Sequence, residues 1–363
     1  MPQLKPDIET FARIKVVGIG GAGGKAVTRM VDHKINGVDF ITINTDVQDL
    51  HFTKARQKIH IGKNLTKGLG AGMNPEVGRQ AAEENRDEIH ETLKGADMVF
   101  LTCGLGGGTG SGASPIVAEV ARDAGALTIG VVTKPFTFEG IQRQRIAEEA
   151  WHLLKDRVDA LITIHNDRLL NVITKDTSLL SAFTICDDVL RQAVQGISDL
   201  IITPGIINVD FADVRAIMAD TGSALMGVGF GAGEDRAVTA AKAAVSSPLL
   251  DISIDGARGV LFNVSGGSDL TMFEINEAAK IVTESIDRDA KVIFGAVHDE
   301  KLKKGEVKIT VIATGFGASS NLKLPLSKEE RSEARKNIPV TEKVGEIQSE
   351  WDAVPAFLRR RGK

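Results

Sequence analysis

Glycines gather in the stretch LTCGLGGGTGSGASP, Leu101–Pro115, which begins within an apolar run. Six of the nine residues from Gly104 to Gly112 are glycine. Ordering glycine costs more conformational entropy than ordering any other residue, so such a cluster needs a local reason. Backbone N–H groups that converge on one polyanion supply this reason, because a residue without Cβ permits a close approach. The stretch therefore predicts a phosphate-binding loop after a buried strand, with hydroxyl donors from Thr109 and Ser111.

The rest of the chain predicts an α/β fold. From Arg13 to about Ile202, short β-branched runs alternate with amphipathic helical stretches such as PEVGRQAAEENRDEIHETLKG, which is typical of a parallel sheet covered by helices. Apolar residues at intervals of three or four predict one long helix over 178–202, capped by Thr177 or Ser178. Further strand and helix patterns up to Gly317 predict a second α+β unit.

Composition narrows the functional classes. The formal net charge is -4 and aromatic residues make up 4% of the chain, which argues against a nucleic-acid partner. No apolar run approaches the roughly 18 to 20 residues of a spanning helix, so we expect no direct membrane insertion. The N-terminus lacks a secretory signal, and Cys103 and Cys186 are too few for a disulfide framework. We therefore expect a cytoplasmic protein.

A second glycine cluster, GIGGAGGKAV, also lies between a predicted strand and a predicted helix. In a parallel sheet, both loops emerge at the carboxyl edge, where ligands bind. Gly18, Gly20 and Gly23 satisfy G-x-G-x-x-G, and Asp46 lies at about the distance of the ribose acid in a dinucleotide fold. An NAD-dependent oxidoreductase is therefore an alternative interpretation. It leaves the Gly104–Gly112 cluster unexplained and offers no His or Tyr near a nicotinamide.

Two further patterns each allow a structural and a functional interpretation. The loop GLGAGMNPE, Gly68–Glu76, is either an ordinary helix start or a contact for a third phosphate. NVDFADV places Asp210 and Asp213 on one face at a helix start, where carboxylates stabilise the helix by ~0.3 to 1 kcal/mol. These carboxylates can orient an attacking water only in another molecule's site. Such a head-to-tail contact generates a filament if it does not close. If they are only helix-start charges, the protein assembles with negligible hydrolysis.

The long helix carries a candidate base site. Phe183 and Asp187 lie four residues apart, so an aromatic ring and a carboxylate are side by side. Guanine offers N1–H and N2–H₂ to such a carboxylate and adenine does not. Core packing is the competing interpretation of Phe183.

Taken in order, these motifs indicate a family. GIGGAGG, NTD, GLGAGMNPEVGR, GGGTGSG, VTKPFTFEG and NVDFADV resemble the FtsZ family of tubulin-like bacterial cell-division GTPases. The resemblance covers about Ile14 to Phe316 and the terminal VPAFLRRR. It implies an enzyme that binds GTP or GDP with Mg²⁺, polymerises head-to-tail with itself into the division-ring scaffold, and hydrolyses GTP at the subunit interface.

The resemblance also implies a domain organisation. The segments are a flexible N-terminus (1–12), a GTP-binding domain (13–177), a central helix (178–203), an activation domain (204–318), a flexible linker (319–350) and a partner-binding peptide (351–363). The terminal peptide resembles the one that docks on membrane-tethering division proteins such as FtsA. The implied location is the division site at midcell.

Site residues follow from the same resemblance. The acidic loop assigns catalysis to Asn208, Asp210 and Asp213, and we assign no residue as a metal ligand. Nucleotide contacts fall to Gly20, Gly21, Ala22, Gly23, Gly24, Lys25, Asn44, Asp46, Ala71, Gly72, Gly107, Gly108, Thr109, Gly110, Glu139, Arg143, Asn166, Phe183 and Asp187. Glu139 and Arg143 are expected at the ribose, and Asn166 at the base. Lys25 stands where the family commonly has Asn, and its ammonium is expected near a phosphate or in solvent.

Overall fold

A single sheet runs through the described part of the protein. The computed structural model describes residues 12–170, 177–203, 205–247, 253–299 and 302–316. These belong to one compact unit, Met1–Gly317, and the second unit, Ala318–Lys363, lies outside them. The expected N-terminal segment up to residue 11, the linker and the terminal peptide therefore also lie outside the described residues.

Ten strands of the described residues form this sheet in the order β3-β2-β1-β4-β5-β6-β7-β10-β8-β9. The strands are β1 (Ile14–Ile19), β2 (Val38–Asn44), β3 (Gln57–His60), β4 (Met98–Gly104), β5 (Leu127–Lys134), β6 (Ala160–His165), β7 (Gly222–Ala232), β8 (Gly259–Gly266), β9 (Lys291–His298) and β10 (Glu306–Thr314). The pairs from β3 to β7 are parallel, β10 is antiparallel to β7 and β8, and β8 and β9 are parallel. This confirms the expected α/β class with its parallel sheet.

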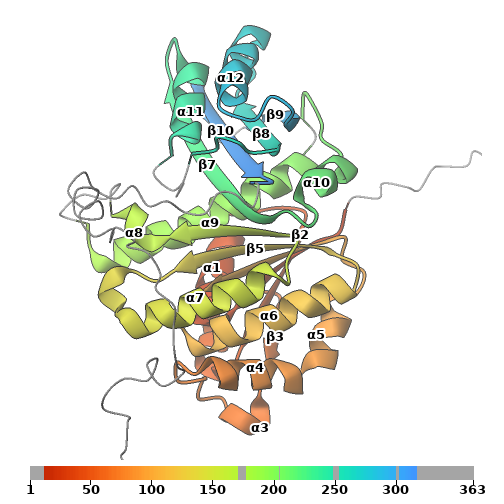
Figure 1. Ribbon diagram of the computed structural model, residues 1–363, viewed down its shortest axis with the longest axis vertical. Helices are drawn as coiled ribbons and strands as arrows, with labels where there is room; N and C mark the ends of the chain where they lie inside the picture. Colours follow the sequence, from red (N-terminus) through yellow and green to blue (C-terminus); the bar gives the residue numbers. More distant parts are fainter. Residues whose placement is uncertain (1–11, 171–176, 204, 248–252, 300–301, 317–363) are drawn as a thin grey trace, which may run out of the picture. The chain divides into compact units, whose positions relative to one another are not determined.

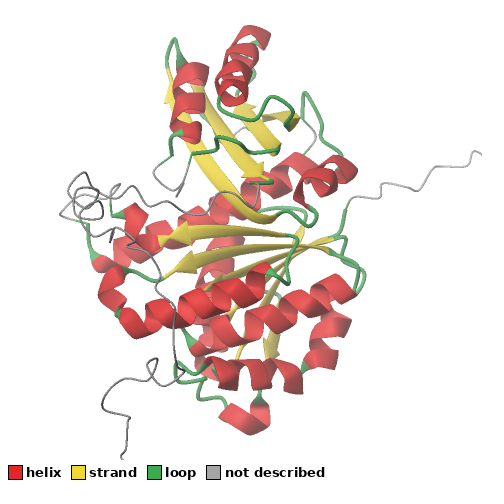
Figure 2. Cartoon of the chain, in the orientation of Figure 1, coloured by secondary structure: helices red, strands yellow, loops and turns green. Residues whose placement is uncertain are grey.

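Helices cover both faces of the parallel strands (Figure 2). The helices are α1 (Gly20–Asp32), α2 (Val47–Phe52), α3 (Lys63–Thr66), α4 (Pro75–Glu84), α5 (Arg86–Leu93), α6 (Gly108–Asp123), η1 (Thr137–Glu139, a 3-10 turn), α7 (Ile141–Lys155), α8 (Asn166–Leu169), α9 (Leu179–Ile202), α10 (Phe211–Met218), α11 (Arg236–Val245) and α12 (Met272–Glu284). Side chains alternate along β1, so Ile14 and Val16 pack with α1 and α9, whereas Val17 and Ile19 pack with α4 to α7. The sheet thus separates two cores.

The long helix is confirmed. Its N-cap is Ser178, whose hydroxyl accepts a hydrogen bond from Ser181 N at 3.1 Å. At 1.5 Å per residue, α9 is roughly 36 Å long. Its buried face, which includes Leu190, Val194 and Ile197, joins the same core as β1 and α1. The ribbons of α9 and α1 lie next to each other in Figure 1.

The predicted helical stretch after Asn74 is interrupted. Asn85 ends α4 and precedes α5, with a backbone ψ of 20°. Its Oδ1 accepts a hydrogen bond from Gly62 N at 2.9 Å. The side chain thus bonds to a distant loop, and the regular apolar spacing hides this break from the sequence.

The second half has its own core. Ala240, Ala244, Phe262, Val282 and Val311 pack together between the strands β7, β10 and β8 and the helices α11 and α12. Within the described residues, no helix is both long and apolar enough to cross a membrane.

Candidate nucleotide site

A cavity of about 940 Å³ opens at the carboxyl ends of β1 and β4. These neighbouring strands lead into α1 and α6, which pack on opposite faces of the sheet. Where neighbouring strands lead into helices on opposite faces, a crevice forms between the two connections, and open α/β sheets bind ligands there. Fifteen of the expected nucleotide residues line the cavity: Gly20, Gly21, Ala22, Gly24, Lys25, Asn44, Gly107, Gly108, Thr109, Gly110, Glu139, Arg143, Asn166, Phe183 and Asp187.

Two helix N-termini form one end of this cavity. α1 begins at Gly20 and α6 at Gly108, so unpaired N–H groups of both first turns lie at the cavity wall. Gly20 has a φ of 71°, and a Cβ on it would lie 3.1 Å from Gly110 N. Both facts favour glycine at this position. This end suits a phosphate chain, because aligned N–H groups favour an anion.

The two hydroxyls of the signature loop lie in different environments. Thr109 lines the cavity, and its Oγ1 is 2.7 Å from the Thr45 hydroxyl. Ser111 is buried, does not line the cavity, and accepts a hydrogen bond from Gly106 N at 2.9 Å. Ser111 therefore stabilises the turn, and its expected role as a hydroxyl donor to the ligand stays a prediction.

Four expected residues do not line the cavity. Gly23 lies where α1 packs against β4, and a Cβ on it would be 2.4 Å from the Thr102 carbonyl oxygen. Asp46 caps α2 and accepts hydrogen bonds from Gln48 N and Asp49 N at 2.8 and 3.1 Å. The remaining two are Ala71 and Gly72, in the loop before α4.

The other end of the cavity carries polar groups without partners. Asn166 is 6% exposed, and neither its Oδ1 nor the Nε of Arg29 has a hydrogen-bond partner among the described residues. Both residues line the cavity, so a ligand with polar edges would satisfy them. Phe183 is 39% exposed, and its ring meets the Phe136 ring edge-on at 5.7 Å between centroids. It thus both packs and presents surface to the cavity.

Burial and nearby positive charges have opposite effects on the pKa of Asp187. Burial raises the pKa of its carboxyl to about 6, against the lowering effect of the Arg29 and Lys25 charges. Arg29 Nη2 lies 3.6 Å from Asp187 Oδ2. The sequence reasoning missed Arg29, although it lies four residues after Lys25 and so on the same face of α1. The positive charge of Lys25 lowers the pKa of Asp187, so this charge affects the Asp187 end of the cavity.

Glu139 and Arg143 form an ion pair at the cavity wall. Arg143 Nη1 donates to Glu139 Oε2 at 3.0 Å. The other Glu139 oxygen accepts from Phe136 N at 2.9 Å. The pair is therefore held in place by the turn at η1.

The acidic loop lies apart from this cavity. None of Asn208, Asp210 and Asp213 lines it, and all three are exposed. Asp210 caps α10 by accepting from Asp213 N at 2.7 Å, and Asn208 Oδ1 accepts from Gly205 N at 2.7 Å. From Asp187 to the end of α9 the helix rises roughly 22 Å. One molecule thus carries the cavity and the carboxylates at separate places.

The described residues contain no group of three or more His, Cys, Asp or Glu side chains arranged to hold a metal ion.

Comparison with known proteins agrees with this fold. Residues 13–174 match the Tubulin/FtsZ family, GTPase domain, which defines the class of the protein. Residues 222–317 match the FtsZ family, C-terminal domain. A structure described as an FtsZ dimer, empty, from M. jannaschii has a TM-score of 0.82 and 45% identity, covering 86% of this chain and 93% of that one. The chain belongs to the FtsZ family of tubulin-like GTPases.

Two other solved structures extend the comparison. A single-residue mutant of FtsZ from M. jannaschii has 46% identity and a TM-score of 0.81, covering 85% of this chain and 92% of that one. CetZ2 from Haloferax volcanii, described as a GTPγS-bound protofilament, has 20% identity and a TM-score of 0.73, covering 89% of this chain and 98% of that one. The CetZ2 likeness concerns the fold alone.

The oxidoreductase alternative is wrong. The comparisons place the chain among GTPases. The motif that suggested it has another basis here, because Gly18 and Gly23 pack against each other: a Cβ on Gly18 would lie 2.4 Å from the Gly23 carbonyl oxygen. Asp46, the supposed ribose acid, is a helix cap.

Proposed function

We propose that this protein polymerises head-to-tail into filaments of the cell-division ring and hydrolyses GTP at each subunit interface. The separation of the cavity from Asn208, Asp210 and Asp213 carries this proposal. Phosphoryl transfer depends on positioning and charge stabilisation, and a second subunit's acidic loop would supply the groups that position water. Exposed apolar side chains lie near both parts: Phe52 at the cavity is 79% exposed and Ile206 beside Asn208 is 64% exposed.

The proposed roles follow the two ends of the cavity. The N–H groups of the two glycine turns hold the phosphates, Glu139 and Arg143 contact the ribose, and Phe183, Asn166 and Asp187 contact guanine. Mg²⁺ accompanies the triphosphate, because this ion is usually held by phosphate oxygens and few protein ligands. Residues 13–177 act as the nucleotide domain and 204–318 as the activating domain, joined by the central helix.

The proposal extends to partners and place. The terminal peptide 351–363, on the linker 319–350, binds membrane-tethering division proteins such as FtsA. An apolar cluster beside a basic cluster suits recognition in a groove. The protein then acts in the cytoplasm at the midcell division site.

GTP turnover measured against protein concentration tests the central claim, with light scattering followed in parallel. We expect turnover per molecule to rise steeply above a threshold concentration at which scattering also begins, because only paired subunits complete a site. Scattering in GDP is the control and should stay at baseline. Turnover per molecule that is constant from dilute to concentrated protein, with no scattering, would exclude the composite site.

A further inference from the structure

Helices α4 and α6 touch through their backbones. A Cβ on Gly78 of α4 would lie 2.3 Å from the Gly108 carbonyl oxygen. One turn along α6, a Cβ on Gly112 would lie 1.9 Å from the Pro75 carbonyl oxygen. In both cases the added Cβ would meet a main-chain oxygen, which can move only together with its helix. The first turn of α4 is thus seated on the first turn of α6.

Gly108 is enclosed on a second side by the loop before α4. A Cβ on Gly108 would lie 2.8 Å from Ala71 Cβ and 2.9 Å from Asn74 N. The loop and helix are continuous in hydrogen bonding, since Asn74 N donates to the Ala71 carbonyl and Gly78 N to the Asn74 carbonyl. A shift of α4 against α6 therefore shifts the loop against Gly108.

The start of this loop is tied to another wall of the cavity. Gly70 N donates to the Thr45 carbonyl at 3.3 Å, and the Thr45 hydroxyl meets that of Thr109 at 2.7 Å. The loop thus lies beside the cavity-lining residues Gly108 and Thr109, although Ala71 and Gly72 do not themselves line the cavity.

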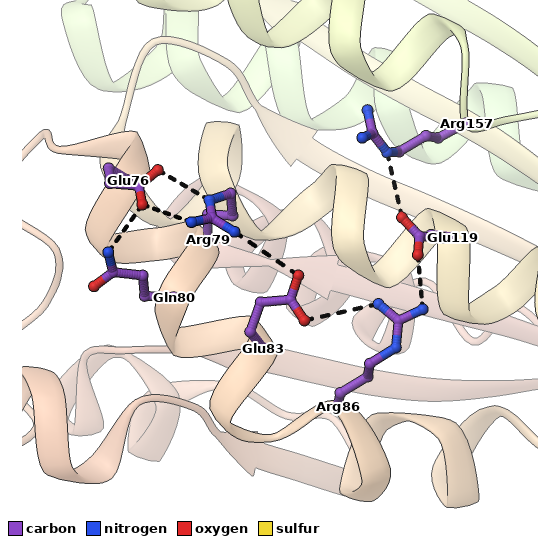
Figure 3. A network of polar contacts seen from close by, with 7 residues as sticks. All are labelled: Glu76, Arg79, Gln80, Glu83, Arg86, Glu119 and Arg157. Carbon is purple, nitrogen blue, oxygen red and sulfur yellow. Dashed lines mark hydrogen bonds and ion pairs between the residues drawn. The ribbon is translucent and has the colours of Figure 1, made fainter.

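The outer side of α4 carries a chain of charged groups, drawn in Figure 3. Arg79 donates to both oxygens of Glu76 at 2.9 and 2.7 Å, and Arg86 joins Glu83 to Glu119 of α6. Arg79 and Glu76 belong to the same helix, so their pair does not hold α4 to α6. Arg86 and Glu119, which link the start of α5 to α6, are 33% and 41% exposed, so water screens their attraction. The glycine contact is therefore the stronger constraint on the position of α4.

We propose that Gly78 is a positioning residue for the third phosphate: by seating α4 on Gly108, it holds loop 68–74 where a triphosphate, and not a diphosphate, would reach it. This inference rests on the proposed function. A larger side chain at position 78 separates α4 from the glycine turn and withdraws the loop from the nucleotide.

Gly78→Ala and its neighbour Arg79→Ala form a matched pair for the test. Both are compared with the wild type by displacement of a fluorescent GDP with GDP or GTPγS, at concentrations too low for assembly. Alanine is the better helix former, so propensity alone would favour the Gly78→Ala helix. We expect this variant to bind GDP like the wild type, while its ratio of GTPγS to GDP affinity falls about tenfold, the loss of a hydrogen bond to a charged group. Arg79→Ala should keep the wild-type ratio.

An unchanged affinity ratio in folded Gly78→Ala overturns the inference while leaving the proposed function intact. A wild type that binds neither nucleotide overturns both. Hydrogen exchange of the wild-type chain decides the matter if Gly78→Ala does not fold. Replacing GDP with GTPγS should protect the amides of 68–74 and 75–79 together. Protection of 68–74 without any change in 75–79 would overturn the inference.

Discussion

Asp187 places a partly buried carboxylate where the proposed function needs an ionised one. Its pKa is raised to about 6 by burial, and the charges of Arg29 and Lys25 oppose this effect. Guanine can donate two hydrogen bonds to the ionised carboxylate, because both of its oxygens accept. In the protonated acid, one oxygen carries a proton that would point at a guanine donor. A proton and the base therefore compete for this residue.

We predict that GDP affinity weakens as pH falls through 6. Below that pH the free protein carries the proton on Asp187, and binding must displace it, so affinity should drop by about tenfold per pH unit. Calorimetric titration of GDP between pH 5 and 7.5 measures this. Asp187→Asn is the control, with weak affinity that does not follow this pH profile. A flat wild-type profile across pH 6 would assign guanine recognition to other groups.

The residues of the site were predictable where glycine or spacing revealed them. The turns at Gly20 and Gly108, and the pair Phe183 and Asp187, line the cavity as expected. Arg29 was missed because an arginine on a charged helix face looks like any solvated side chain. Gly23 was assigned to phosphate and also packs closely against Thr102 of β4, and a sequence does not distinguish these two reasons for glycine.

Individual helices and strands were also largely predictable, since apolar periodicity reports burial. The strand order of the second half was not, because pairing depends on contacts distant in sequence, such as Val307 with Gly266. Three glycines in β7 carried a signal that was overlooked. A Cβ on Gly227, Gly229 or Gly231 would lie within about 2 Å of carbonyl oxygens in α11. Glycine at every second strand position thus marks a helix packed unusually close.

An ion cluster joins α11 to the start of α12. Arg236 is 5% exposed and donates to Glu274 and Asp269, each at 2.6 Å. We predict that Arg236→Met lowers the free energy of unfolding by about 3 kcal/mol, because it leaves two carboxylates without their cation. Urea unfolding of the GDP-bound monomer measures the loss. The exposed Arg145→Met, which breaks a pair with Glu149, is the control and should change stability by less than about 0.5 kcal/mol.

The same cluster has a pH signature. The Arg236 hydrogen bonds hold the pKa of Glu274 at about 2, below its usual range. The stabilisation is therefore complete above pH 4.5 and is lost as pH falls through 2. The stability difference between wild type and Arg236→Met should shrink over that window. A difference that stays constant from pH 5 to pH 2 would contradict this assignment.

At the scale of the whole molecule, two defective variants should complement each other. Asp213→Ala keeps the cavity but lacks a carboxylate, while Ala22→Trp fills the cavity and keeps the acidic loop. Each alone should hydrolyse little GTP. In an equal mixture, about one quarter of random head-to-tail interfaces pair an intact cavity with an intact loop, so turnover should exceed the sum of the separate rates.

Mixing Asp213→Ala with a double variant that carries both changes is the matched control, because no interface in that mixture is complete. Its turnover should stay at the level of Asp213→Ala alone. Equal rates in both mixtures would mean that each subunit cleaves its own nucleotide.

The position of the carboxylates beyond the far end of α9 has a consequence for any filament built as proposed. A row of n subunits contains only n − 1 junctions, so one terminal subunit always keeps an uncut nucleotide. The two tips then differ chemically although every subunit is identical. Growth and shrinkage would follow this polarity without any additional regulator.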